Sequence, residues 1–126
     1  MLVVSRFSVA DADGAAFESD AADALAALAE RPGFVRGRVS RAVDNPSAWL
    51  LVTEWEGVGA WRRALGGYDV KLRASPLMAR SLDEPSTFED LHLVDATGSA
   101  SRGSDRAADA DVVAVGEAAG PRVVPK

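Results

Sequence analysis

The stretch RPGFVRGRVSRAVDNPSAWLLVTEWEGVGAWRRAL, residues 31–65, determines which fold the chain can adopt. Its segments Phe34–Val43 and Ala48–Glu56 are rich in valine, leucine and aromatic residues, which predicts two strands. Asp44–Ser47 separates them with an Asp-Asn-Pro-Ser sequence that is typical of a turn. Because Ala48–Glu56 starts with consecutive apolar residues, we expect it to be a central strand. Gly57–Leu65 is predicted to be a short helix.

The flanking segments complete the pattern. Leu2–Val9 alternates like a strand, and Ser86–Val94 is predicted to be the last strand. Ala15–Glu30 is predicted to be a helix, because its large apolar residues recur at helical spacing. The order strand, helix, strand, strand, helix, strand predicts an α+β, ferredoxin-like split βαβ fold with a four-stranded antiparallel sheet.

The two faces of this sheet should differ in what covers them. Within the second strand, Phe34 and Arg36 are predicted to share one face, and Gly37 and Val39 the other. Helices would cover only one side of such a sheet. We expect two short helices to be too small to cover all the large apolar residues of the strands, namely Phe7, Trp49, Leu51, Trp55 and Phe88. The sequence therefore predicts a homodimer, in which a second copy covers the bare face.

The length of 126 residues fits one domain, and its aromatic residues all lie between Phe7 and Phe88. After Asp95 the sequence has no aromatic residue and no leucine, so it lacks the apolar surface that offsets the entropy cost of ordering. We expect a folded domain over residues 1–96 and a disordered tail over residues 97–126, in which the valine-rich segments could add a strand.

Composition limits the partners and the location of the protein. The net charge of −5 argues against nucleic-acid binding, which needs a clustered positive field. No stretch is apolar enough to cross a membrane, and the start MLVVSRFSV lacks the basic region of a signal peptide. We therefore expect a cytoplasmic protein. The absence of cysteine excludes disulfides and thiolate ligands.

The sequence of residues 31–65 resembles the antibiotic biosynthesis monooxygenase (ABM) family of the dimeric α+β barrel superfamily. The resemblance rests on Pro32-Gly33 at the start of the second strand, on Asp44-Asn45-Pro46 in the turn, on Glu54-Trp55 at the end of the third strand and on Trp61 in the helix. It covers roughly residues 1–94. It implies a dimeric barrel with a pocket between sheet and helices in each subunit.

The same resemblance limits which activity to expect. Members of this family include cofactor-free oxygenases that turn polycyclic phenols into quinones, and also haem-degrading enzymes. Trp61 matches the tryptophan of the haem degraders. However, Phe7 stands at or near the position of their asparagine, and Val70 or Lys71 near that of their axial histidine. Haem degradation is therefore disfavoured.

Four residues are candidates for a site. Phe7 and Trp61 could contact a flat substrate, as aromatic rings do well. Tyr68 could contact the substrate and transfer a proton, if the preceding Gly66-Gly67 swings it over the sheet toward Trp61. His92, the only histidine, could act as an acid or base because its pKa lies near neutrality. Each has a structural alternative: Trp61 in the core, Tyr68 on a surface loop and His92 as a hydrogen-bonded strand residue.

These candidates include no cofactor site. The sequence contains no phosphate-binding or dinucleotide-binding motif, and His92 has no second histidine or cysteine beside it to form a metal site. We expect no cofactor and no metal. The function that fits is a cofactor-independent monooxygenase that acts on a flat phenolic or polyketide-like aromatic, because a deprotonated dihydroxyaromatic can itself reduce oxygen. The alternative is a non-catalytic dimeric module that binds a small apolar ligand.

Overall fold

The computed structural model describes residues 1–103 and 122–123. Its elements, in chain order, are β1 (Leu2–Ser8), the 3-10 turn η1 (Asp11–Asp13), α1 (Gly14–Ala29), β2 (Phe34–Arg41), β3 (Ala48–Trp55), α2 (Val58–Leu65), the π-helical turn η2 (Val70–Ala74), α3 (Ser75–Met78), β4 (Thr87–Phe88), β5 (His92–Asp95), β6 (Gly98–Gly103) and β7 (Arg122–Val123).

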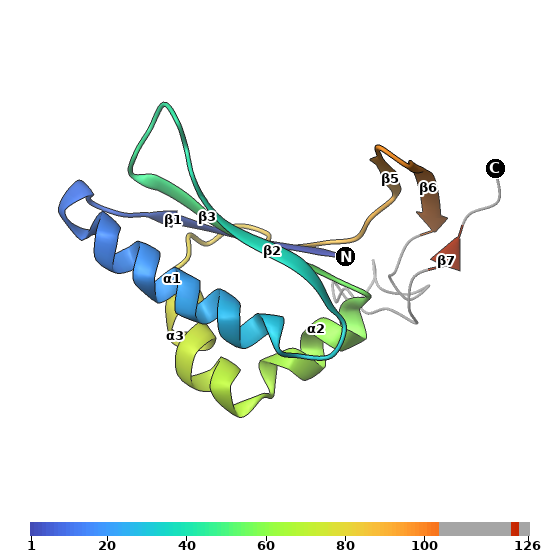
Figure 1. Cartoon of the computed structure of the whole chain (residues 1–126), viewed down its shortest axis with the longest axis horizontal. Helices are drawn as coiled ribbons and strands as arrows, with labels where there is room; N and C mark the ends of the chain where they lie inside the picture. Colours follow the sequence, from blue (N-terminus) through green and yellow to red (C-terminus); the bar gives the residue numbers. More distant parts are fainter. Residues whose placement is uncertain (104–121, 124–126) are drawn as a thin grey trace.

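The main sheet has four antiparallel strands in the order β2-β3-β1-β4. The long helix α1 and the shorter α2 and α3 all lie on one side of this sheet (Figure 1). The predicted α+β, ferredoxin-like fold is confirmed, and so is the central place of Ala48–Trp55. No helix in the described part of the chain is both long and apolar enough to span a bilayer.

The helix side of the sheet buries the large side chains of both central strands. Val3, Phe7, Trp49, Leu51 and Trp55 are each no more than 4% exposed. Of the five residues that were expected not to fit all together under the helices, Phe7, Trp49, Leu51 and Trp55 are covered, and Phe88 on the edge strand is not. The physical reason is the alanine-rich face of α1, which lets the helix approach the sheet closely while the sheet supplies the large groups. This face consists of Ala21, Ala24 and Ala27, which are fully or almost fully buried.

A β-bulge changes the faces of β2. The pairing register shifts between Phe34, which is opposite Trp55, and Arg36, which is opposite Glu54. Phe34 consequently lies on the helix side with Trp55, and Arg36 lies on the opposite side. The prediction that Phe34 and Arg36 share a face was wrong, because the extra residue Val35 reverses the alternation.

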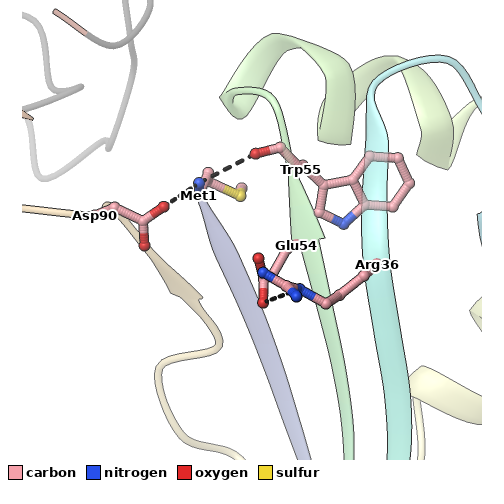
Figure 2. Close-up of polar contacts among 5 residues, drawn as sticks. All are labelled: Met1, Arg36, Glu54, Trp55 and Asp90. Carbon is pink, nitrogen blue, oxygen red and sulfur yellow. Dashed lines mark hydrogen bonds and ion pairs between the residues drawn. The ribbon is translucent and has the colours of Figure 1, made fainter. Parts of the chain in front are cut away.

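The last predicted strand, Ser86–Val94, is two strands in different sheets. Phe88 pairs with Leu2 at the start of β1, so the following residues run past the end of the sheet. There Asp90 turns toward β1, and its Oδ2 lies 2.7 Å from the Met1 ammonium nitrogen (Figure 2). From His92 the chain forms β5, which pairs with β6 in a second sheet that lies away from the helices (Figure 1).

The predicted domain boundary at residue 96 falls in the turn of the β5–β6 hairpin. Asp95 Oδ1 accepts hydrogen bonds from the Thr97 hydroxyl at 2.7 Å and from its backbone N–H at 2.8 Å. The bond from the hydroxyl has the larger effect, and both hold the pKa of Asp95 below its usual value. Strands β6 and β7 lie beyond the predicted boundary, with β7 paired to β6. Most of the predicted tail, residues 104–121 and 124–126, lies outside the described residues.

No helix of the described residues covers the other face of the main sheet. Its central positions carry aliphatic side chains that are half-buried or exposed, with Leu50 36% exposed, and Phe88 on the edge strand β4 is 40% exposed. The apolar members of this outer face are Leu2, Val4, Leu50, Val52 and Phe88. Toward its end, Arg36 Nε donates to Glu54 Oε1 at 3.0 Å (Figure 2).

Candidate functional site

The aromatic residues under the sheet form two separate clusters. In the first, the ring centroids of Phe7 and Phe17 are 4.9 Å apart, and those of Phe17 and Trp49 are 5.3 Å apart. The second cluster lies at the other end of β3, where Trp55 contacts both Phe34 and Trp61, each at 5.4 Å between centroids. Phe7 and Trp61, which were predicted to line the same pocket, thus belong to different clusters.

Trp61 lies on the buried face of α2 and is 9% exposed. Its ring packs at an interplanar angle of 56° on Trp55, whose own indole N–H donates to Thr53 Oγ1 at 2.8 Å. Trp61 faces inward because α2 is amphipathic: it buries Ala60, Trp61 and Ala64, whereas Arg62 and Arg63 are exposed. Its position fits the wall of a pocket between α2 and the sheet, and also fits the structural alternative of a core residue.

Tyr68 does not lie over the sheet. It is 76% exposed, and the preceding Gly66 has φ −84° and ψ −7°, which are helical values. The expectation that the two glycines would swing Tyr68 toward Trp61 was wrong, because the chain resumes a helical path immediately after them. In that path η2 makes one wider turn, because Pro76 cannot donate the hydrogen bond that would reach back to Leu72.

His92 is also remote from the other predicted residues. It begins β5 and pairs with Ser101, so it belongs to the hairpin and not to the main sheet, and its side chain is exposed. The structure therefore brings none of Phe7, Trp61, Tyr68 and His92 together within one chain. In the described part of the chain no group of three histidine, cysteine, aspartate or glutamate side chains is arranged to hold a metal ion.

Three cavities lie away from Trp61, which lines none of them. One of about 450 Å³ lies between α1 and β2, and includes Trp49 and Arg41. Another, of about 340 Å³, lies at the β2–β3 hairpin and is lined mainly by apolar groups, with Arg6, Phe7 and Leu50 among them. A third, of about 300 Å³, lies between α1 and the η2–α3 segment.

Trp49, which helps to line the cavity between α1 and β2, has an unusual hydrogen-bonding state. Trp49 is 4% exposed, and its indole nitrogen is buried with no hydrogen-bond partner among the described residues. The Arg41 guanidinium carbon lies 5.3 Å from the centroid of the Trp49 ring. From the sequence alone, Trp49 is expected to be a core or dimer contact, and Arg41 is one of three arginines, with Arg36 and Arg38, that could bind a carboxylate. Strand alternation could have distinguished Arg41, because an odd-numbered residue lies on the opposite face of the strand from Arg36 and Arg38.

Known proteins resemble this chain in sequence and in fold. The family model described as antibiotic biosynthesis monooxygenase matches residues 1–71. Deoxynogalonate monooxygenase from Streptomyces nogalater is 34% identical over 103 residues, which cover 79% of this chain and 86% of the relative.

Two solved structures extend the comparison. SnoaB, a cofactor-independent oxygenase from Streptomyces nogalater, matches with a TM-score of 0.59 at 32% identity. The match covers 70% of this chain and 90% of the SnoaB chain. A protein from Deinococcus radiodurans has a TM-score of 0.62 at 19% identity, covering 78% of this chain and 100% of its own, and this likeness concerns the fold alone.

Proposed function

This chain belongs to the antibiotic biosynthesis monooxygenase family, and we propose that it is a cofactor-independent monooxygenase that oxidises a flat phenolic or polyketide-like aromatic to a quinone. The observation that carries the proposal is the 34% identity to deoxynogalonate monooxygenase, which extends over 79% of the chain. A resemblance in fold alone would not support an activity, since one fold hosts many functions.

The reaction balances without an added reductant. A phenol with a ring C–H takes up one O₂, one oxygen atom becomes the new quinone carbonyl, and the other leaves as water with the ring hydrogen and the phenolic hydrogen. The substrate thus supplies all the electrons. The protein has to bind the phenolate, keep water away from it and help to move the proton.

The predicted residues keep their proposed roles as follows. Phe7 and Trp61 would contact the aromatic rings of the substrate from the helix side of the sheet, and Tyr68 and His92 would transfer protons. The exposure of Tyr68 and His92 in the single chain means that these two roles require a second copy or a bound ligand to enclose them. The same exposure favours the second candidate function, a non-catalytic dimeric module that binds a small apolar ligand.

A homodimer is part of the proposal. The outer face of the main sheet places Leu2, Val4, Leu50, Val52 and Phe88 side by side. A second copy packed against this face would remove the apolar side chains from water and complete a barrel.

Haem degradation is not proposed. Phe7 is buried in the first aromatic cluster. Of the two residues near the position of the axial histidine, Val70 is fully buried and Lys71 is exposed. The side chains of Phe7 and Val70 have no group that can ligate iron.

Oxygen consumption tests the proposed activity. The purified chain, treated with a chelator and checked for flavin absorbance, is mixed with a panel of dihydroxynaphthalenes and anthrones under an oxygen electrode. We expect one O₂ consumed per quinone formed, at a rate above that of heat-denatured protein. Saturable binding of these compounds without oxygen consumption would support the non-catalytic module instead.

A further inference from the structure

The helix α2 rests on the turn that leads into β2, and the two meet at Gly33 (Figure 1). The backbone φ of Gly33, +88°, lies in the left-handed region, which residues with a side chain rarely adopt. A Cβ atom on Gly33 would also lie 2.4 Å from Ala60 Cβ and 3.7 Å from Ala60 Cα. The backbone angle and the space therefore both require glycine, and Ala60 packs directly on its backbone.

A backbone hydrogen bond joins the same two segments. The Glu56 N–H donates to the Gly33 carbonyl oxygen at 2.8 Å, just before α2 begins at Val58. We call Gly33, Glu56 and Ala60 the β2–α2 joint. An eight-residue helix is marginal by itself, so tertiary contacts such as this joint have to fix where α2 lies.

Each residue of the joint is next in sequence to one ring of the second aromatic cluster. Gly33 precedes Phe34, Glu56 follows Trp55, and Ala60 precedes Trp61. The Trp55 ring centroid lies 5.4 Å from that of Phe34 and 5.4 Å from that of Trp61. A displacement at the joint therefore changes the spacing of these rings, because one rigid peptide unit separates each ring from the contact.

We propose that Gly33 and Ala60 are positioning residues, which act through Trp61 by setting the spacing between its ring and that of Trp55. This inference rests on the proposed function, in which Trp61 contacts the aromatic rings of the substrate. A larger side chain at either position would push α2 away from the turn and displace Trp61. It should therefore weaken substrate binding more than it slows the reaction of the bound substrate.

Oxygen-consumption kinetics of Gly33→Ala test the joint. The change should raise KM about tenfold and alter kcat by less than about twofold, because Trp61 contributes to binding and not to the chemical step. Ala60→Gly in the same chain removes the methyl group that the new Cβ would strike, so KM should return to within about twofold of its original value. The melting temperature of the double variant should stay low, because alanine is still strained at a positive φ and glycine weakens the helix.

Two control variants lie in or next to the same helix. Gly66→Ala, at the other end of α2, adds a Cβ at a helical φ of −84°, where it would meet the Arg63 carbonyl oxygen at 3.4 Å, and should leave KM unchanged. Ala64→Gly removes another buried methyl group of α2, one that is not among the atoms nearest to Gly33, and should leave KM raised in the Gly33→Ala chain. Equal rescue by Ala64→Gly and Ala60→Gly would overturn the proposal. So would an unchanged KM in Gly33→Ala.

Ala60→Val tests the same contact from the helix and replaces Gly33→Ala if that variant does not fold. It adds two methyl groups where α2 rests on Gly33, so KM should rise while kcat changes little. A KM equal to that of the unmodified chain would refute the positioning role.

Near-ultraviolet circular dichroism separates this inference from the proposed function. The signal of two tryptophans in contact depends on the distance and angle between their rings and requires no substrate. If Gly33→Ala changes this signal, Ala60→Gly restores it and no phenol is oxidised, the positioning of Trp61 stands and the oxygenase falls. If every variant oxidises phenols with the same KM, the oxygenase stands and the positioning role falls.

Discussion

Trp61 contributes to the core and is proposed to contact ligand, and two substitutions separate these contributions. Truncation of a buried tryptophan costs about 3–5 kcal/mol of stability, so Trp61→Ala should lower the melting temperature markedly. Trp61→Phe keeps most of the packing on Trp55. If Trp61 also stacks on a ligand, this variant should weaken binding by about 0.5–1.5 kcal/mol while the melting temperature falls much less.

Tyr68→Ala, at an exposed aromatic, is the control for the stability measurement alone, because Tyr68 is itself proposed to act on the substrate. Because Tyr68 is 76% exposed, its loss should change the free energy of unfolding by less than about 0.5 kcal/mol. Calorimetry and thermal melts on the same samples give both quantities. Unchanged affinity in Trp61→Phe would make Trp61 a core residue alone.

At this scale the sequence predicts orientation better than location. The alternation of β1 correctly places Val3 and Phe7 on one face, because strand parity is a local property. The position of Tyr68 depends on how the chain leaves α2, and two glycines are compatible with a sharp bend and with the helical path that the structure has. The pairing state of the Trp49 indole depends on three-dimensional neighbours from α1, and no spacing in the sequence reports it.

At the scale of elements, the contact between α1 and β2 rests on the lack of a side chain at Gly37. A Cβ there would meet Leu25 at 2.6 Å, the Val52 carbonyl oxygen at 3.0 Å and Thr53 Cγ2 at 3.1 Å. Gly37→Ala should therefore cost about 1–3 kcal/mol, as overpacking does. Gly98→Ala, where a Cβ would meet nothing within 4 Å, is the matched control.

Chemical denaturation of both variants measures this difference. Gly37→Ala should lower the denaturant midpoint while Gly98→Ala leaves it nearly unchanged. Equal stability of the two variants would mean that Leu25 and β2 move apart at little cost.

Two elements differ from their sequence predictions for reasons that lie outside the segments themselves. Ser86–Val94 has the composition of one strand, but its pairing stops at Leu2, where β1 begins, and Asp90 then contacts the Met1 ammonium. In β2 the bulge at Val35 lets Phe34 reach Trp55 across the strands. Sequence periodicity reports the local preference of a segment, whereas partner strands decide how much of it pairs and in which register.

At the scale of the whole molecule, the outer face of the sheet leads to the last prediction. Its aliphatic residues are neighbours across β1 and β3, where Val4 is paired with Val52. We expect light scattering at micromolar concentration to give twice the chain mass of 13.2 kDa. Val4→Glu should convert this species to a monomer, because it would place a carboxylate among the apolar side chains that the interface buries.

The control is a second valine-to-glutamate change that adds the same charge elsewhere. Val43 is fully exposed in the β2–β3 turn, so Val43→Glu should leave both the mass and the melting temperature unchanged. If the unmodified chain is a monomer, the outer face must be covered in some other way and the barrel proposal fails. If Val4→Glu stays dimeric with an unchanged melt, the two copies meet through another surface. Exposed apolar residues of the β5–β6 hairpin, Leu93 and Val94, would then be the next place to test.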